Sequence, residues 1–468
     1  MKKILLLCFL SFLFLFNAKA THSLGGYITY EHVSGLTYEV LLIIYADPNS
    51  PAIGRKEILL SWGDGNSDSI LVDSEVLIGN DLMKRTFKSN HTYPSAANYT
   101  ISLEEPNRSG GIDNISNSVN IPLYLETRLT ISPTLAIKNK SITLEADPIA
   151  ITKIGEDFKQ NLSVSEPDGD ILIFELVETK GTGGASAPGF FFPDSVSINR
   201  KSGAFLWKSP QQLGVFIFTI KVTECRDGNQ IGSNLIDFQV RITSKSTKTR
   251  FREVAAIPTD TNGNYEVFLN SSDSIEFSIA FSDSLLNPVE LEIYSDALNE
   301  SNKPSFLVDS MSTGYIRNTF KWNVNASNLR CKPYLFTFRG NSTVNFEKLE
   351  KDLSLVVYVR DQSLFNCDSA CQYLINSLED KLKMNSTLVT VYPIPFKEST
   401  TIEITNSRIM NGTLKLFDNL GRKVYSIVIN NKSQIILERN NLPPGIYFYA
   451  IENEQKYVAS GKLVISDF

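Results

Sequence analysis

The sequence predicts an all-β protein made of tandem β-sandwiches, with a small β-sandwich at its C-terminus. Short runs of alternating apolar and polar residues, such as Tyr38 to Tyr45, are separated by clusters of Gly, Pro, Asn and Asp that mark turns. Phe (28) and Tyr (18) are abundant and Met (5) is scarce, a composition that suits pleated, half-buried strands. The length of 468 residues predicts three to four domains of about 100 to 150 residues each.

Residues 1–20 are expected to be a signal peptide. Met1 to Lys3 give a cationic start, Ile4 to Phe16 are almost wholly apolar, and Ala18-Lys19-Ala20 is a small-x-small pattern that signal peptidase cleaves. The mature chain would then begin at Thr21. The apolar run is shorter than the roughly 20 residues of a membrane-spanning helix, and we expect no transmembrane segment in the mature chain.

Charge and cysteine content narrow the class of protein further. The formal net charge of −6 at pH 7 gives no general attraction for nucleic acid or for anionic membranes. Four cysteines follow the leader, an even number in an exported chain, so we expect at least one disulfide. They are Cys225, Cys331, Cys367 and Cys371.

Residues 21–133 carry two fragments that define the first predicted sandwich. One is Trp62-Gly63-Asp64-Gly65, a glycine-flanked turn, and the other is His91-Thr92-Tyr93 followed by Asn98 to Ile101. Both fragments resemble the PKD domain, although Leu60, Trp62 and Ala97 stand where that family has Trp, Phe and Gly. The resemblance implies a β-sandwich. We expect His91 to be architectural rather than a metal ligand or general base, since no nucleophile motif lies near it.

Residues 134–244 form the second predicted sandwich. Three segments occur in order: Ser165 to Phe174, Gly203 to Trp207, and Gly214 to Glu224. Together they resemble the cadherin-like, dystroglycan-type immunoglobulin sandwich. The closing stretch, Glu224 to Ser233, also resembles a segment of surface proteins from gliding bacteria of the Bacteroidetes type.

Carboxylates of this sandwich raise the question of calcium, which binds six to eight oxygen ligands. The candidate ligands are Glu166, Asp168, Asp170, Glu224 and Asp227. True cadherin sites draw further acidic residues from a linker that is missing here. We therefore favour a solvated turn shaped by Asp168 and Gly169, with calcium as the alternative and no other cofactor.

Residues 245–384 repeat the second sandwich in outline. Phe320-Lys321-Trp322 echoes Phe205-Leu206-Trp207, and Tyr334 to Arg339 echoes the strand from Val215 to Val222. A period near 115 residues indicates duplicated domains rather than a solenoid.

Two further features mark the end of this module. Cys331 precedes one late strand and Cys367 follows the next, so we expect a disulfide between them, with Cys371 as the alternative partner of Cys331. A helical apolar period predicts a short helix near residues 369–383.

Residues 389–468 form the C-terminal module. Its four segments are Tyr392 to Phe396, Leu416 to Val424, Leu442 to Phe448 and Gly461 to Ile465, which predict about seven strands joined by Pro and Gly turns. Their order closely resembles the type A C-terminal sorting domain of the type IX secretion system, although Ile394 replaces the usual Asn. The matching residues are Tyr392, Pro393, Pro395, Phe396, Gly421, Arg422, Gly445, Tyr447, Lys462, Leu463 and Val464.

This resemblance implies the partner and the destination. The tail would bind the secretion machinery, and the body would be released or attached to the outer surface of a Gram-negative bacterial outer membrane. Six Asp-Ser-apolar triplets resemble the O-glycosylation sequon of that phylum, and intact-mass measurement would test them. Their serines are Ser69, Ser195, Ser274, Ser284, Ser310 and Ser369.

The sequence shows no nucleophile elbow, zinc-helix motif or phosphate-binding glycine loop. We therefore expect a non-catalytic surface or secreted protein that acts in adhesion or gliding-related contact with an unknown surface protein or glycan. Its most conspicuous candidate loop runs from Gly181 to Phe192. The alternative is a carbohydrate-binding accessory protein of a polysaccharide-degrading system. A hydrolase built on Glu166 and Asp170 is the third hypothesis.

Overall fold

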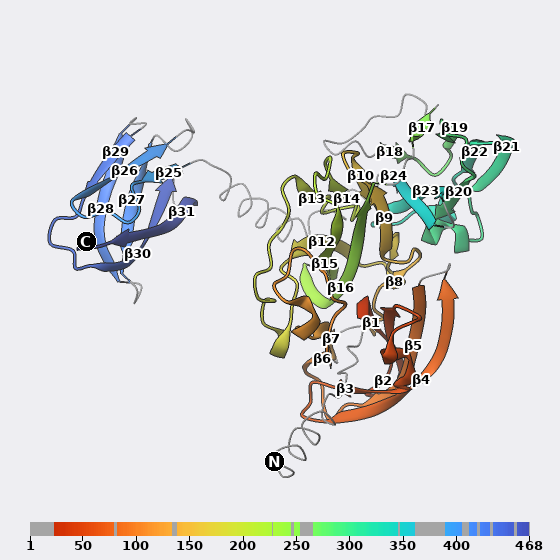
Figure 1. Ribbon diagram of the computed structural model, residues 1–468, viewed down its shortest axis with the longest axis horizontal. Coiled ribbons are helices and arrows are strands. Elements are labelled where there is room, and N and C mark those ends of the chain that lie inside the picture. Colours follow the sequence, from red (N-terminus) through yellow and green to blue (C-terminus); the bar gives the residue numbers. More distant parts are fainter. Residues whose placement is uncertain are drawn as a thin grey trace, which may run out of the picture. The chain divides into compact units, whose positions relative to one another are not determined.

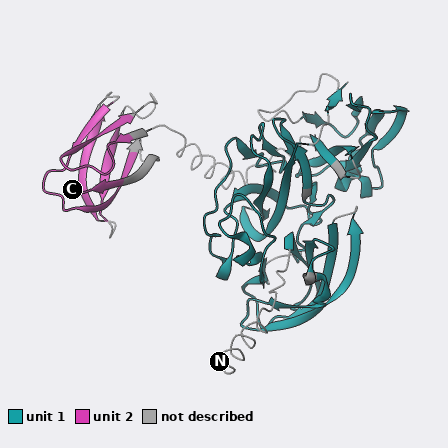
Figure 2. Cartoon of the chain, viewed as in Figure 1, with its two compact units in different colours: residues 1–371 teal, residues 372–468 magenta. Residues whose placement is uncertain are grey.

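The computed structural model confirms the all-β class (Figure 1). It describes residues 23–78, 82–132, 138–226, 228–244, 248–252, 265–344, 347–360, 389–404, 411–418, 422–430, 434–453 and 456–467. The chain divides into two compact units, residues 1–371 and 372–468 (Figure 2). The predicted signal peptide and the predicted helix near 369–383 lie outside the described residues. Short 3-10 turns occur at Pro51–Gly54, Ser118–Asn120, Thr182–Gly184, Asp296–Asn299 and Ala326–Asn328.

The first seven strands belong to one sheet that closes on itself. They are β1 (Ser23–Ser34), β2 (Thr37–Ala46), β3 (Glu57–Ser61), β4 (Ser67–Ile78), β5 (Leu82–Thr92), β6 (Asn98–Glu105) and β7 (Leu123–Thr130). Their order is β1-β2-β5-β4-β3-β6-β7, and the later strand β16 (Asn229–Thr243) pairs with both β7 and β1. The sheet surrounds a core that includes Ile28, Leu60 and Trp62.

Two side-chain contacts support the turns of this part. The Tyr99 hydroxyl donates to the Ser95 carbonyl at 2.9 Å, which ties a corner of the sheet. The His91 Nε2 atom lies 2.8 Å from Asp64 Oδ2, and the His91 ring stacks on Trp62 with ring centroids 4.5 Å apart. His91 therefore packs against the Trp-Gly-Asp-Gly turn.

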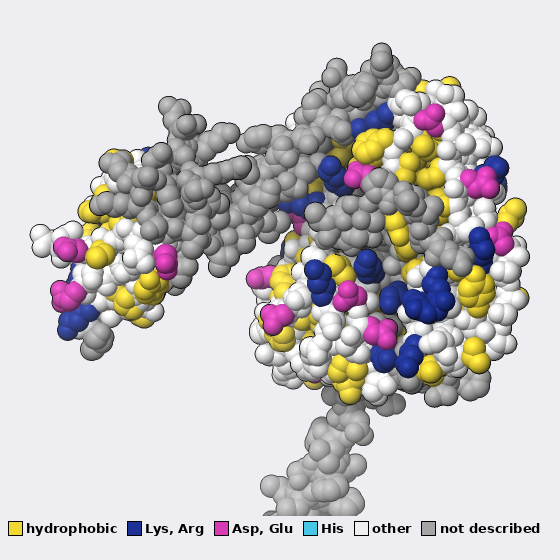
Figure 3. Space-filling view, turned by 90° about the horizontal axis from the view of Figure 1, so that it is seen from above, with side chains coloured by type: hydrophobic (Ala, Val, Ile, Leu, Met, Phe, Trp, Pro, Cys, Tyr) yellow, Lys and Arg dark blue, Asp and Glu magenta, His cyan; other side chains and the backbone are white. Residues whose placement is uncertain are grey.

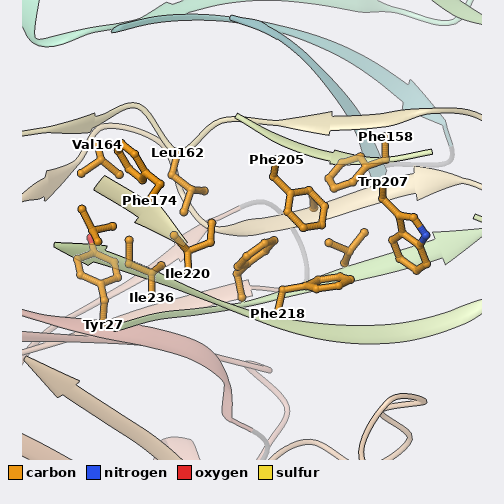
Figure 4. Close-up of a cluster of buried hydrophobic side chains, with 14 of the residues drawn as sticks. Tyr27, Phe158, Leu162, Val164, Phe174, Phe205, Trp207, Phe218, Ile220 and Ile236 are labelled. Carbon is orange, nitrogen blue, oxygen red and sulfur yellow. The ribbon is translucent and has the colours of Figure 1, made fainter. Parts of the chain in front are cut away.

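The next strands add a second layer and share β16. They are β8 (Thr143–Leu144), β9 (Ile149–Lys153), β10 (Phe158–Gln160), β11 (Val164–Ser165), β12 (Ile171–Val177), β13 (Val196–Ile198), β14 (Phe205–Trp207) and β15 (Gly214–Arg226). The large sheet continues as β16-β15-β12, and a three-stranded sheet has the order β10-β14-β13. Between them lies an aromatic core with Phe158, Phe205 and Phe218 (Figure 4).

The third part is a sandwich of two four-stranded sheets. Its strands are β17 (Thr249–Arg252), β18 (Tyr265–Leu269), β19 (Ser274–Asp283), β20 (Val289–Tyr294), β21 (Ser305–Ser312), β22 (Tyr315–Asn323), β23 (Tyr334–Val344) and β24 (Glu347–Val359). The sheet orders are β17-β19-β22-β21 and β18-β24-β23-β20. Phe277, Phe320 and Phe336 lie between the sheets.

The connectivity of this sandwich repeats that of the second part. β18 runs parallel to β24 as β9 runs parallel to β16, and β20-β23-β24 corresponds to β12-β15-β16. Trp207 packs on Phe216 with centroids 4.9 Å apart, and Trp322 packs on Tyr334 at 4.8 Å. The two tryptophan motifs of the sequence therefore occupy equivalent positions.

The three predicted sandwiches are fused in one unit rather than strung as separate domains. The core of the second part also contains Tyr27 and Tyr45 of the first and Tyr358 of the third. At the junction with the third part, the Asn161 amide donates to Asp352 at 2.8 Å, and Arg339 donates twice to that carboxylate at 2.9 Å. The predicted boundaries at 133/134 and 244/245 are thus crossed by a shared sheet and a shared core.

The C-terminal unit has seven described strands, as the sequence predicts. They are β25 (Val389–Tyr392), β26 (Ser399–Ile404), β27 (Asn411–Phe417), β28 (Lys423–Asn430), β29 (Gln434–Glu438), β30 (Gly445–Asn453) and β31 (Lys456–Ile465). A β25-β26-β29 sheet and a β28-β27-β30-β31 sheet enclose a separate core.

A buried ion pair joins the first part of the chain to β16. Arg108 Nη2, in the loop after β6, lies 2.6 Å from Asp237 Oδ2 on β16, and both side chains are at most 1% exposed. Thr219 also donates to Asp237. β1 reaches the same point only because Gly25 has no side chain, since a Cβ atom there would lie 2.3 Å from the Asp237 carbonyl oxygen.

We expect Asp237→Asn to lower the free energy of unfolding by about 3 to 5 kcal/mol, because it leaves the Arg108 charge buried without its partner. Denaturant unfolding of the mature chain measures the change. The control is Glu276→Gln, which removes an exposed ion pair with Lys321 and should cost less than about 1 kcal/mol. Equal effects of the two substitutions would contradict the role of the buried pair.

Candidate functional site

The predicted acidic loop gathers three of its five candidate ligands. The carboxylates of Glu166, Asp168 and Asp170 offer oxygens that all lie within 4.8 Å of one another. Glu166 accepts from the amides of Asp168 at 2.9 Å and Asp170 at 2.6 Å, so it forms the inner wall of the turn. Glu166 and Asp170 are 2% and 3% exposed. The expected solvated turn is therefore largely buried, because residues of neighbouring elements cover it.

Side chains of the protein itself supply the positive charge to this loop. Arg226, at the end of β15, donates to both carboxylate oxygens of Asp170 at 2.6 Å and approaches Asp168 at 3.4 Å. Lys332, from the third part of the chain, lies 3.5 Å from Glu166. A calcium ion would need the oxygens that these two cations already contact. The residues therefore fit calcium poorly, and they fit an internal ion-pair network well.

Glu224, the fourth candidate, lies beside this network but faces the interior. Its carboxylate is fully buried and accepts from Asn139 at 2.9 Å. Burial raises the pKa of Glu224 to about 8, and the negative charges of Glu166 and Asp170 add to this rise although Asn139 opposes it. Burial likewise raises the pKa of Glu166 to about 7, against the charge of Lys332. The fifth candidate, Asp227, lies outside the described residues.

This arrangement also bears on acid–base chemistry. A glycosidase needs two carboxyl groups that face a substrate in a cleft. Asp170 is held at both oxygens by Arg226, and Glu166 is covered by its own turn. The geometry disfavours a reacting pair at this place.

An aromatic loop between β12 and β13 is an accessible candidate for binding. Phe191 is 49% and Phe192 39% exposed, while Phe190 packs inward on a cluster that includes Ile112 and Ala187. Phe190 and Phe192 meet edge to face at 4.9 Å. The loop therefore presents two aromatic side chains on a packed base.

The backbone of this loop is fixed from another part of the chain. Asn114 lies wholly buried in the loop after β6. Its side chain donates to the Phe191 carbonyl at 3.2 Å and exchanges two hydrogen bonds of 2.9 Å with the backbone of Ile217. Gly189 has a φ of +70°, and a Cβ atom there would lie 2.0 Å from Ser116 Oγ. Asn114 and Gly189 carry no sequence motif, so the sequence did not indicate their roles.

The predicted cysteine and serine sites are partly described. Cys225 and Cys331 are both disulfide-bonded, and the involvement of Cys225 was not predicted. Cys367 and Cys371 lie outside the described residues, so the pairing of Cys331 with either stays a prediction. The candidate glycosylation serines Ser69, Ser195, Ser274, Ser284 and Ser310 are all exposed. Ser369 lies outside the described residues, and glycosylation stays a prediction.

The tail motif residues mostly hold the fold of the tail. Phe396 is 2% exposed, and its backbone bonds to Val464 of the last strand and to Ser466 just after it. Arg422 closes the β27–β28 turn by donating to Asp418 at 2.7 Å, and the Tyr447 hydroxyl donates to the Pro443 carbonyl at 2.8 Å.

The remaining motif positions complete this picture. Leu463 is 1% exposed, Gly445 begins β30, and the peptide bonds before Pro393 and Pro395 are cis. Tyr392 is 45% exposed. Gly421 and the side chain of Lys462 lie outside the described residues.

Substitution Glu224→Gln should flatten the pH dependence of stability. With a folded pKa of about 8 and an unfolded value of about 4.3, Glu224 binds more protons in the folded chain across this window. Stability therefore falls as pH rises from about 5 to 8. We expect the drop in melting temperature between pH 5 and 8 to be smaller in the variant. An unchanged drop would contradict the assignment, and the exposed Glu276→Gln should leave it unchanged.

Calcium should not stabilise the chain. Arg226 and Lys332 already contact the carboxylates that calcium would need. Because only a ligand that binds the folded state stabilises it, neither millimolar calcium nor a chelator should shift the melting temperature of the mature protein. Arg226→Gln should lower stability by about 3 kcal/mol, since Asp170 loses its partner. A fall in the wild-type melting temperature on chelation would restore the calcium hypothesis.

Comparison with known proteins supports a family for the tail alone. No curated protein matches the chain. Among solved structures, the ectodomain (Ig1–Ig3) of mouse nectin-like molecule 4 has 9% identity and a TM-score of 0.15, covering 68% of this chain and 97% of that one. A sialic acid binding region of a Streptococcus sanguinis SK1 adhesin has 10% identity and a TM-score of 0.17, covering 64% and 96%. Scores this low support no inference of fold or function.

Within the described residues, no helix has the length and apolar character to cross a membrane. Residues 390–466 match the family model of the secretion system C-terminal sorting domain. Their seven described strands agree with the number that the tail motif predicts. The chain thus carries a C-terminal sorting domain of the type IX secretion system, which directs it to the cell surface or the medium.

Proposed function

We propose that the exported chain is a non-catalytic adhesion or surface-contact protein, and that the loop of residues 181–192 makes the contact. The observation that supports this most is the exposure of Phe191 and Phe192 on a backbone fixed by Asn114. A rigid aromatic pair loses little conformational entropy when it binds. Burial of an exposed Phe in a partner stabilises a complex by about 1.5 to 3 kcal/mol.

The surroundings of the loop agree with a contact role. The base of the loop joins residues of the first and second parts of the chain, as the bonds of Asn114 to Phe191 and Ile217 show, so a bound partner would pull on one fused body. One face of the molecule, drawn in Figure 3, carries Lys and Arg side chains among Asp and Glu side chains.

The double substitution Phe191→Ser with Phe192→Ser should reduce adhesion about tenfold or more, since aromatic anchors dominate many interfaces. The assay measures attachment of cells that display the full-length chain to other cells and to insoluble chitin and cellulose. Retention on a polysaccharide that soluble sugar abolishes would favour the alternative, a carbohydrate-binding accessory protein.

The matched control changes two other adjacent exposed residues, Leu285→Ser with Leu286→Ser, in the loop after β19. Leu285 is 42% and Leu286 62% exposed, so the control removes comparable apolar surface elsewhere. Wild-type adhesion by the Phe variant, or equal loss in the control, would refute the assignment of the loop.

A further inference from the structure

The outer face of the four-stranded tail sheet carries several apolar side chains beside Lys415, although it faces away from the core of the tail. In β30, Tyr447, Tyr449 and Ile451 alternate into the core. Ile446 and Phe448 point to the other face and are 45% and 48% exposed. A strand that is apolar on both faces is typical of a strand that is covered on both faces.

Neighbouring strands extend this apolar face. Phe417 of β27 pairs directly with Phe448, and Val464 of β31 pairs with Ile446. On the edge strand β28, Val424 is 38% and Val428 61% exposed. We call the outward side chains of Phe417, Val424, Ile446, Phe448 and Val464 the apolar tail face.

The motif residues of the tail leave recognition unexplained. Phe396 and Leu463 are buried, Arg422 is bonded to Asp418, and Tyr447 is bonded to the Pro443 carbonyl. Phe396, Leu463 and Tyr447 therefore serve mainly to stabilise the sandwich, whereas Tyr392 and Arg422 also keep exposed surface. An apolar surface outside the motif is a further candidate for contact with a partner.

We propose that the apolar tail face is the surface by which the sorting domain docks on a protein component of the secretion machinery. The inference rests on the export role of residues 390–466 and adds the face and its chemistry. The partner site would be an apolar surface, since only hydrophobic complementarity rewards burial of Ile446 and Phe448. A second copy of the chain is the competing occupant.

The opposite sheet of the tail provides a matched control. Ile436 on β29 is 66% exposed and lies between Gln434 and Glu438, which are also exposed. It is therefore an isolated apolar residue among polar ones, which is common on protein surfaces. A substitution there removes exposed apolar area without touching the apolar tail face.

The test compares export of full-length variants in a bacterium that has a type IX secretion system. Ile446→Thr with Phe448→Thr should lower the exported fraction about tenfold or more, with the chain retained inside the outer membrane. Ile436→Thr should be exported like the wild type. Resistance of residues 389–468 to limited proteolysis in each purified full-length variant verifies that the tail is folded. Normal export of the folded double variant would overturn the proposal.

Photo-crosslinking keeps the test decisive if the double variant does not fold. A photoreactive phenylalanine analogue at position 448 should form an adduct with an outer-membrane component of the machinery, and the same analogue at position 436 should not. An adduct with a second copy of the chain, or equal adducts at both positions, would refute the proposal. Deletion of residues 389–468 distinguishes failure of the sorting role from failure of the docking face. Unchanged export of the deletion variant would refute the sorting role itself. Lost export of the deletion variant, together with normal export of the double variant, would refute only the docking face.

Discussion

The position of strand β16 is the constraint on which the large unit depends. β16 pairs with β15, β7, β1 and β9, so it belongs at once to the closed sheet of the first part and to the sandwich of the second. Asp237 on this strand is bonded to Arg108 and Thr219 in the interior, and Gly25 lets β1 approach it. Since a buried charge is tolerated only with its partner, these contacts lock the register and direction of several strands together.

Internal cations serve a similar purpose at the other junction. Lys332 of the third part approaches Glu166 of the second, and Arg339 holds Asp352 where Asn161 also donates to it. Polar groups that are buried across a junction must find partners there, so they favour one relative arrangement of the two parts. The rigid aromatic loop at residues 181–192 is a product of the same fusion, because its anchor Asn114 comes from the first part.

Most motif residues of the tail that the structure describes hold its fold. Its motif residues are mostly core or turn residues, as Phe396, Leu463 and Tyr447 show, and they explain why a short pattern suffices to identify the fold. The apolar face around Phe448 lies outside these structural roles. The proposed docking would make the sorting signal a folded surface rather than a linear peptide.

The sequence by itself determined the all-β class, the repeated tryptophan sandwiches and the sorting tail, because alternation, turn residues and local motifs encode them within short windows. Tertiary structure alone decided that the sandwiches share one sheet and one core, that Arg226 and Lys332 neutralise the acidic loop, and that Phe191 and Phe448 are exposed. These features depend on residues far apart in the chain. Alternation in a strand shows which residues share a face, but only packing decides which face is covered.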